Sequence, residues 1–324
     1  MTTLSMRVIV WSFQQKPFRR VTVSSSKSPV RVDLDDHVRT SGLTNAIQVA
    51  NDALELCFNL RGCGWDWSNG LKIPPETRPT SSTAAFILPT FISLILNILI
   101  FDVVHYFIQW HAPLTIGSPK GGTIFDHAIP FVQRYLRSSV ITVCTGLAVY
   151  CVIQIAYDAC TLLGILVFRQ HTSHWPPIFR DPWFSPSLSE LWAERWHQFF
   201  RHNFISLGGK PMTMLMGRAG GILGIFFVSG LLHYIGLWGM GNGSDFPRMV
   251  GFFMMMGVGI IMEHTWKAFT GQKVRGFLGC VWVWIWVLGW AHMLVEAWAV
   301  RGVMAATFFP SAYRPAFNIF GPLF

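Results

Sequence analysis

The sequence predicts an all-α fold, a polytopic transmembrane helical bundle of about five spans with one amphipathic interfacial helix. Only 13% of the 324 residues are charged and 52% are hydrophobic, whereas a soluble domain carries roughly 25% charged residues. The chain also contains 15 Trp and 27 Phe, and bulky aromatic side chains are favoured where a chain meets the membrane–water interface. This composition excludes a cytosolic globular enzyme, a disordered protein and a disulfide scaffold.

Five apolar stretches are candidates for membrane-crossing helices. Four runs between charged residues hold 23, 20, 26 and 20 residues, at 79–101, 138–157, 219–244 and 276–295. About 18–20 residues cross some 30 Å of hydrocarbon as a helix. The run 249–262 holds only 14 uncharged residues, but flanking residues up to Trp266 make it a short or tilted span. Residues 159–168 continue the second run past Asp158, which indicates a long or kinked helix.

The basic residues orient this bundle. With the N-terminus in the cytosol, the cytosolic segments 1–78, 169–218 and 267–275 contain 19 of the 25 Lys and Arg residues. Cytosolic segments of membrane proteins carry such an excess. We therefore assign the net charge of +9 to cytosolic loops that face anionic membrane lipid, and we expect no nucleic acid as a partner.

The composition also divides the chain into three regions. Residues 1–82 are polar and basic and form an N-terminal arm that we expect in the cytosol. Residues 83–302 form the transmembrane region. Residues 303–324 contain Pro310 and Pro315 among many aromatic side chains, and proline interrupts regular helices. We therefore expect the last region to be an interfacial tail and not a further span.

One ionisable side chain stands within the third span. His233 follows Arg218 by 15 residues, so it should lie roughly 20 Å into the membrane by helical rise. Polar groups inside a span are costly and are kept for a reason. Several glycines leave this helix open to close approach by a neighbour or a ligand, and Ser229 shares the face of His233. The alternative interpretation is a histidine that only makes a structural hydrogen bond.

An amphipathic helix is predicted in the loop before this span. Ser187 and Glu190 have the spacing of a capping box, so the helix should begin at Leu188. Large apolar side chains recur at intervals of three and four and form a face suited to the membrane interface or to the bundle. They are Leu188, Leu191, Trp192, Trp196, Phe199, Phe200 and Phe204.

Two polar residues and a glycine pair complete this segment. His197 and Arg201 are four residues apart and should share a second face of the helix. Gly208 and Gly209, with Pro211 behind them, are expected to end it. A solvated His–Arg face without a chemical role is the alternative interpretation.

Two motifs resemble a known family. The stretch SLSELWAERWHQFFR at 187–201 is similar to the S-L-x-x-F-W-x-x-x-W-[HN] motif of the wax-synthase branch of membrane-bound O-acyltransferases. That branch includes fungal acetyltransferases of terpenoid and meroterpenoid pathways. The family pattern F-x-x-S-G-L-x-H is matched from Phe226 to His233. RGCGWDW at 61–67 resembles the Arg-Gly-x-Gly-Trp element of fungal members, and Glu263 also fits. The resemblance covers about residues 56–300, with a motif core at about 170–266.

The chain departs from the family pattern in two ways. Leu191, Ala193 and Glu194 stand where the family usually has Phe, Gly and a basic residue. Fungal relatives commonly carry additional N-terminal spans, whereas this chain opens with about 80 mostly polar residues. The second departure indicates a short or truncated form.

The resemblance implies an acyl-CoA-dependent O-acyltransferase of secondary metabolism in the endoplasmic reticulum membrane. We expect it to transfer an acetyl group from acetyl-CoA, as co-substrate, to a hydroxyl of a lipophilic terpenoid or meroterpenoid alcohol. The family assigns to His233 the role of the base that takes the hydroxyl proton. His197 would orient the acyl group or stabilise the oxyanion. No bound cofactor and no metal ion are expected.

Three basic residues are candidates for binding acyl-CoA. Arg195, Arg201 and Lys210 lie on the predicted cytosolic side, and the phosphates of coenzyme A need cationic partners. Lipid headgroups are the alternative partners of these side chains.

Two other functions remain open. One is a wax-ester-type transferase that moves a long acyl chain to a fatty alcohol. The other, from a different class, is a non-catalytic membrane protein or transporter, although transporters place paired ionisable residues at mid-span. A di-iron oxygenase is disfavoured because the H-x-x-x-H and H-x-x-H-H boxes are absent from the sequence.

Overall fold

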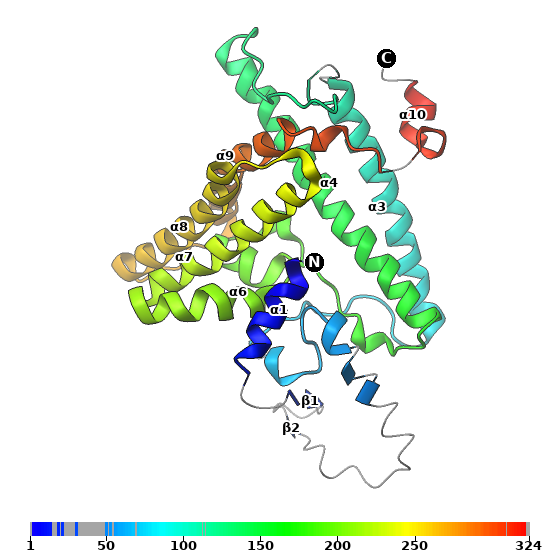
Figure 1. Ribbon diagram of the computed structural model, residues 1–324, viewed down its shortest axis with the longest axis vertical. Helices are drawn as coiled ribbons and strands as arrows, with labels where there is room; N and C mark the ends of the chain where they lie inside the picture. Colours follow the sequence, from blue (N-terminus) through cyan, green and yellow to red (C-terminus); the bar gives the residue numbers. More distant parts are fainter. Residues whose placement is uncertain are drawn as a thin grey trace.

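The computed structural model describes residues 2–14, 18–19, 21–22, 30–31, 49–50, 52–53, 55–68, 70–111, 113, 115–308 and 310–321. Much of the predicted N-terminal arm 1–82 and the end of the predicted tail 303–324 lie outside these residues. Long helices dominate the rest (Figure 1). They are α3 (Thr83–His111), α4 (Phe131–Leu166), α7 (Lys210–Leu237), α8 (Phe246–Thr270) and α9 (Gly276–Ala299).

Shorter elements connect and flank these helices. The helices are α1 (Thr2–Ser12), α5 (Leu188–Glu190), α6 (Arg201–Phe204) and α10 (Pro315–Phe320). Single turns of 3-10 or π type are η2 (Asp66–Ser68), η3 (Thr172–His174), η4 (Pro182–Phe184), η5 (Leu191–Arg195), η6 (Ile205–Gly209), η7 (Trp238–Asn242), η8 (Val303–Ala305) and η9 (Ser311–Tyr313). The strands β1 (Val21–Thr22) and β2 (Val30–Arg31) pair antiparallel, with Val21 opposite Arg31.

The predicted number of spans is confirmed. Within the described residues, five helical stretches are long and apolar enough to cross a membrane, and each contains or overlaps one predicted run. They are Thr83–His111, Phe131–Leu166, Arg201–Gly241, Phe246–Thr270 and Gly276–Ala299. Asp158 does not interrupt α4, which continues for 36 residues and is about 54 Å long at 1.5 Å per residue. The chain is therefore an all-α multi-pass membrane protein.

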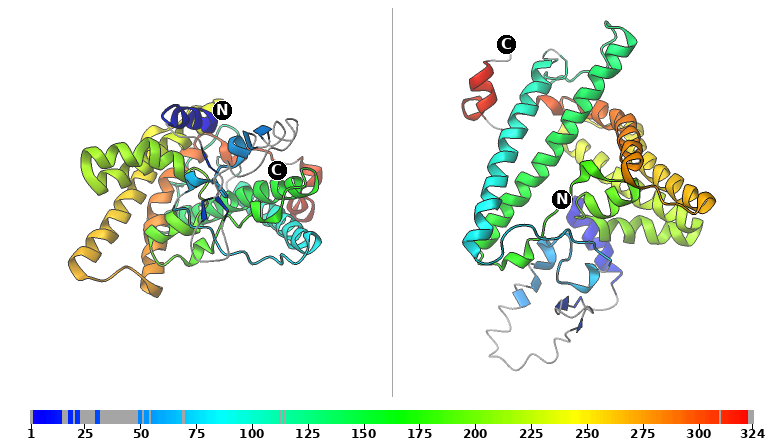
Figure 2. Two further views of the ribbon diagram at one scale, coloured as in Figure 1. Left: turned by 90° about the horizontal axis from the view of Figure 1, so that it is seen from below. Right: turned by 180° about the vertical axis from the view of Figure 1, so that it is seen from behind.

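The spans form two groups. Helices α3 and α4 pack along each other as an antiparallel pair, while α7, α8 and α9 form a second layer (Figure 2). The two groups meet where α4 packs against α9. Large apolar side chains point away from the bundle on the outer face of α3, at the three- and four-residue intervals expected of a lipid-facing surface. They include Leu88, Phe91, Ile92, Ile95 and Leu99.

The connecting loops gather at two ends of the bundle. Gly122, after α3, donates its backbone N–H to the carbonyl of Ala299 at 3.1 Å, and Arg301 donates to the carbonyl of Ser244 at 3.2 Å. The loops after α3, α7 and α9 therefore share one end, the tail end. Residues 70–82 and 167–200 share the other end of the α3–α4 pair, the basic end (Figure 1). Helix α9 is joined to this segment by the Trp284 indole, which donates to the carbonyl of Trp183 at 3.0 Å.

The third span is a hairpin, which differs from the predicted single helix. Helix α7 is broken at Met216 and Gly217, where Gly217 has a φ of 65°. Residues 201–216 and the rest of α7 run side by side, and a methyl group at Gly208 would collide with the carbonyl of Gly224. The predicted helix end at Gly208–Gly209 is wrong because these glycines serve close backbone packing. Pro211 lies in the first turn of α7, where its missing N–H is tolerated.

The predicted amphipathic helix begins as expected but does not continue. Ser187 caps it, with its hydroxyl accepting from the backbone N–H of Glu190 at 3.1 Å, and the helix begins at Leu188. A π turn follows, and Trp196 is extended with φ −84° and ψ 154°. The side-chain amide of Gln198 donates to the carbonyls of Trp192 and Trp196 at 2.9 and 3.0 Å. These side-chain hydrogen bonds take the place of helical backbone hydrogen bonds, so both carbonyls keep a partner where the helix breaks.

One buried carboxylate fastens the start of this segment to the spans. Glu263 of α8 accepts from the backbone N–H groups of Leu188 and Ser189 at 2.6 and 3.0 Å. It also accepts from the Ser189 hydroxyl at 2.7 Å and from the Trp282 indole of α9 at 3.1 Å. The first N–H groups of a helix have no partner inside the helix. Glu263 therefore joins α5, α8 and α9 at a single point.

A second buried carboxylate fastens the C-terminal residues to α3. Asp102 pairs with the Arg314 guanidinium at 2.7 Å and accepts from the N–H of Ala316 at 2.8 Å. Arg314 also donates to the side-chain oxygen of Gln109 at 3.0 Å. Both partners of the pair are buried, with side-chain exposures of 2% for Asp102 and 6% for Arg314. The described tail thus packs on the tail end of α3 through an ion pair.

We expect Asp102→Ala to destabilise the tail strongly. Removing one partner of a buried ion pair leaves the other charge unpaired, which costs about 3–5 kcal/mol. Thermal unfolding in detergent should show this loss, and limited proteolysis should cut within 303–321. Arg248→Gln removes the exposed pair of Arg248 with Asp245 and serves as the control, with an effect below about 1 kcal/mol. Equal stability of the two variants would contradict the prediction.

We expect Glu263→Gln to weaken the attachment of α5. All four groups that face this carboxylate are donors, and an amide turns N–H groups toward some of them. Loss of hydrogen bonds to a charged group costs about 1.5–3 kcal/mol each, so unfolding in detergent should occur at lower temperature. Thr265→Ala, two residues along α8 and exposed, is the control and should change stability by less than about 0.5 kcal/mol.

Candidate active site

A cavity of about 540 Å³ lies between the α3–α4 pair and the α7–α9 layer. Residues of segment 182–205 line it from the basic end, and Trp298 near the end of α9 also lines it. Its walls are mostly apolar side chains of α4, α7, α8 and α9. The volume falls within the range of about 300–1,000 Å³ that is usual for ligand pockets. Both His197 and His233 line this cavity.

The contacts of His233 fix its tautomer. Its Nδ1 lies 2.8 Å from the backbone carbonyl of Ser229, one turn earlier on α7. A carbonyl oxygen only accepts, so Nδ1 must carry the proton and the neutral ring keeps Nε2 as an acceptor. The ring packs against Phe253 of α8, with 4.4 Å between the ring centroids. The His233 ring is thus held in one orientation, with Nδ1 directed at the Ser229 carbonyl.

His197 reaches the cavity from a different element. It follows the break at Trp196, so it does not share a helix face with Arg201 as predicted. Its ring stacks on Phe199 at 5.1 Å and meets the ring edge of Phe179 at 6.2 Å. Nδ1 is buried and has no hydrogen-bond partner among the described residues. Burial, with smaller contributions from the neighbouring His233 and Arg61, lowers the pKa of His197 to about 3.

An ion-pair network holds the π turn that precedes His197. Arg180 contacts the carboxylates of Glu190 and Glu194 at 3.1 and 2.9 Å. Arg195 contacts Glu190 at 2.8 Å, and Lys72 pairs with Glu194. The backbone N–H of Arg180 donates to the carbonyl of Arg195 at 3.0 Å. Glu194, where the family usually has a basic residue, is therefore part of the scaffold of the site.

The Arg-Gly-x-Gly-Trp element contributes a second support. Arg61 is buried and donates to the carbonyl of Pro177 and to the Tyr157 hydroxyl, each at 2.7 Å. It also donates to the carbonyl of Pro176 at 2.5 Å. Phe179, which contacts the His197 ring, follows two residues later. Arg61 thus fixes the loop that packs against His197.

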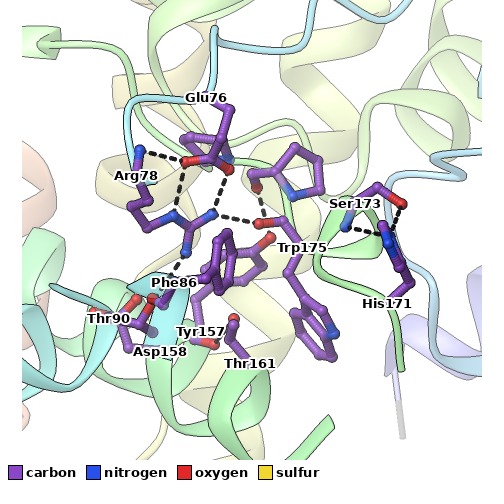
Figure 3. Close-up of polar contacts among 12 residues, drawn as sticks. Glu76, Arg78, Phe86, Thr90, Tyr157, Asp158, Thr161, His171, Ser173 and Trp175 are labelled. Atoms are coloured by element: carbon purple, nitrogen blue, oxygen red, sulfur yellow. Dashed lines mark hydrogen bonds and ion pairs between the residues drawn. The ribbon is translucent and has the colours of Figure 1, made fainter. Parts of the chain in front are cut away.

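A third support lies beside Arg61. Arg78 is bound by the Glu76 carboxylate at 2.7 and 2.8 Å and donates to the carbonyl of Trp175 at 2.5 Å (Figure 3). It also donates to the Thr90 hydroxyl of α3 at 3.3 Å, and its guanidinium lies 4.1 Å from the centroid of the Phe86 ring. Arg61 and Arg78 therefore hold the loop 171–179 against α3 and α4.

The three predicted cofactor-binding cations lie in different surroundings. Arg201 lines the cavity. Lys210 is exposed on the first arm of the hairpin. Arg195 pairs with Glu190 and donates to the carbonyl of Asp181 at 3.0 Å, so its guanidinium is used inside the 180–195 network. The structure brings only Arg201 to the cavity that holds both histidines.

Sequence reasoning gave no role to two groups that the structure singles out. Trp192 lines the cavity, and its indole N–H is buried and has no partner among the described residues. A donor without a partner cannot be recognised from periodicity. Glu263 was noted only as part of the resemblance, although an acid inside an apolar run was a signal in itself. Across the described ranges, no group of three or more His, Cys, Asp or Glu residues could hold a metal ion.

Comparisons with known proteins bear on the same segment. The sequence profile of the Membrane bound O-acyl transferase family matches residues 175–255. Acetyltransferase aurG of Calcarisporium arbuscula is 29% identical over 168 residues, which cover 48% of this chain and 40% of that protein. Acetyltransferase spyB of Aspergillus fumigatus is 28% identical over 36% of this chain and 21% of its own length.

A plant protein is also similar. Long-chain-alcohol O-fatty-acyltransferase of Simmondsia chinensis is 27% identical over 107 residues, 31% of this chain and 30% of that protein. The chain thus spans less than half the length of these three relatives. The resemblance predicted from the two motifs is confirmed: the part of the chain that carries His197 and His233 matches the membrane-bound O-acyltransferase family, alongside fungal acetyltransferases and a wax-type fatty-acyltransferase.

Proposed function

We propose that the protein is an acyl-CoA-dependent O-acyltransferase that acetylates a hydroxyl of a lipophilic alcohol inside the membrane. One observation carries this proposal. His197 and His233 come from separate elements, and both line the same largely apolar cavity. The names of the fungal relatives support acetyl transfer. A terpenoid or meroterpenoid acceptor and the endoplasmic reticulum as location belong to the same proposal.

His233 is the proposed base. Its Nε2 accepts the hydroxyl proton while the alcohol oxygen attacks the carbonyl carbon of the thioester. The tetrahedral intermediate then collapses, the carbon–sulfur bond breaks, and the imidazolium returns its proton to the leaving sulfur of coenzyme A. The hydrogen bond from Nδ1 to the Ser229 carbonyl keeps Nε2 free for this exchange.

His197 is the proposed partner for the acyl oxygen. With its pKa lowered to about 3 by burial, it stays neutral at physiological pH and cannot act as a cation. A neutral ring still carries one N–H, which can donate to the developing oxyanion. The buried N–H of Trp192 is a second donor on the same segment. The family uses Asn or His at this position, and both residues can supply a neutral donor.

The basic end is the proposed entry for acyl-CoA. Arg201 lines the cavity and Lys210 is exposed nearby in the sequence, so both suit phosphate groups that stay in water. Arg195 also belongs to this proposed set, although its guanidinium pairs with Glu190. We propose no role for a bound metal ion or a resident cofactor.

A long-chain transfer to a fatty alcohol is the second candidate function. The similarity to a protein named Long-chain-alcohol O-fatty-acyltransferase favours it, and the apolar cavity walls suit an alkyl chain as well as a terpenoid ring. The preferred acyl length and acceptor decide between the two candidates.

We expect His233→Ala to abolish acyl transfer, with a loss of at least about 100-fold as is usual for a missing general base. Microsomes carrying either form should be incubated with a labelled acyl-CoA series and a mixed panel of terpenoid and fatty alcohols. Equal membrane insertion of the two forms, shown by immunoblot, is the control. Retained transfer by His233→Ala would remove this residue from the mechanism.

We expect the stability of the protein to fall in acid through His197. An unfolded imidazole binds a proton near pH 6.5, whereas the folded ring has a pKa of about 3. The contribution of His197 to the free energy of unfolding is therefore fully present above pH 6.5 and is lost as the pH falls toward 3. Between pH 6.5 and 5 the loss should be about 2 kcal/mol.

Denaturation in detergent across this pH range measures the effect. His197→Asn and His197→Gln should both show a flatter pH profile than the wild-type protein, because neither side chain titrates. Identical profiles for wild type and both variants would show that the His197 ring is not buried in neutral form.

A further inference from the structure

Besides the two histidines, the cavity is lined by a threonine whose hydroxyl has no assigned role. Thr142 of α4 lines it, is only 3% exposed, and its hydroxyl has no hydrogen-bond partner among the described residues. The other α4 residues on this wall, Thr145, Gly146, Val149 and Ile153, follow at helical spacing on the same face. Among them, only Thr145 carries another side-chain hydroxyl.

The unpaired state of Thr142 sets it apart from the other buried threonines of the described helices. A threonine in a helix normally donates to the carbonyl four residues earlier. The threonines that do so here have oxygen–oxygen distances of 2.7–2.9 Å. They are Thr90, Thr145, Thr161, Thr213 and Thr270. Thr142 does not bond to the carbonyl of Ser138, so its hydroxyl is a buried polar atom without a partner among the described residues, on a residue that lines the cavity.

Thr142 lies on a different element from each of the two histidines. Helix α4 packs against α3 and α9, whereas α7, which carries His233, packs against α8. Thr142 and His233 therefore lie on different walls. Ile141, the neighbour of Thr142, belongs to a buried cluster with Val295 and Met304 toward the tail end. His197 lines the cavity from segment 182–205, which is not part of that cluster.

We propose that Thr142 recognises a second oxygen of the acceptor alcohol, distinct from the hydroxyl that is acylated. This inference rests on the proposed function and narrows its substrate class to lipophilic alcohols with two separated oxygen functions, such as a cyclic terpenoid diol or hydroxyketone. A hydroxyl can donate to a carbonyl and can also accept from a second hydroxyl. A buried polar atom without a partner disfavours a purely apolar ligand at that point, which argues against a simple fatty alcohol.

Thr142→Val tests this assignment because it replaces the hydroxyl with a methyl group of similar volume. The acceptors are a cyclic sesquiterpenoid diol and the mono-alcohol of the same skeleton that lacks the second hydroxyl. The variant should raise the KM for the diol about tenfold, in line with the loss of one hydrogen bond. The KM for the mono-alcohol, the KM for acetyl-CoA and kcat should stay at wild-type values.

Two further variants separate recognition from packing. Thr142→Ser keeps the hydroxyl and should restore the preference for the diol. Thr145→Val is the matched control, because the Thr145 hydroxyl lines the same wall but is already bonded to Ile141. It should leave both acceptors unchanged. Equal KM values of wild type and Thr142→Val for the diol, or an equal loss on both acceptors, would overturn the proposal.

A binding measurement keeps this test independent of turnover. The diol should raise the melting temperature of the purified wild-type protein in detergent more than the mono-alcohol does. Thr142→Val should abolish that difference, and Thr142→Ser should retain it. If no acyl transfer occurs with any acceptor but the difference persists, the proposed reaction fails while the recognition role stands. Binding of both alcohols without any difference in the wild type would refute the role of Thr142.

Discussion

The Glu263 carboxylate is the interaction on which the arrangement of the site depends. It accepts four hydrogen bonds, two of them from the first backbone N–H groups of the segment that leads to His197. The same carboxylate lies on α8, which also packs against α7 and the ring of His233. Glu263 therefore links the segment that leads to His197 with the helix that packs against His233, although the two histidines are 36 residues apart in the sequence.

Supports from the other side complete this arrangement. Arg61 and Arg78 hold the loop 171–179, which places Phe179 against His197, and the Arg180 network holds the π turn. Arg61 and Arg78 donate to backbone carbonyls of this loop, and Arg78 and Arg180 also pair with partly exposed carboxylates. The polar contacts are concentrated in these arginine networks, while the walls of the cavity are mostly apolar.

The sequence predicted the spans because hydrophobic length is a local property of the chain. It also predicted the start of the helix at Leu188, because Ser187 and Glu190 lie within one turn. It did not predict the break at Trp196 or the hairpin at Gly217. Both depend on contacts that periodicity does not encode: side-chain bonds of Gln198 and the backbone N–H of Arg180 replace helical hydrogen bonds, and Gly208 meets Gly224 across two arms. The spacing of apolar side chains continues through the break at Trp196 and the turn at Gly217, so this spacing does not reveal either of them.

The sequence by itself determined that this is an all-α membrane protein, and its two motifs indicated the family and the histidine pair. Low charge and long apolar runs leave no other stable environment for the chain. Only the tertiary structure decided which polar groups reach the cavity. Arg195 is turned into a scaffold by Glu190, whereas Arg201, Trp192 and Thr142 line the cavity. The physical reason is that the availability of a polar group depends on its hydrogen-bond partners, and those partners come from elements far apart in the sequence.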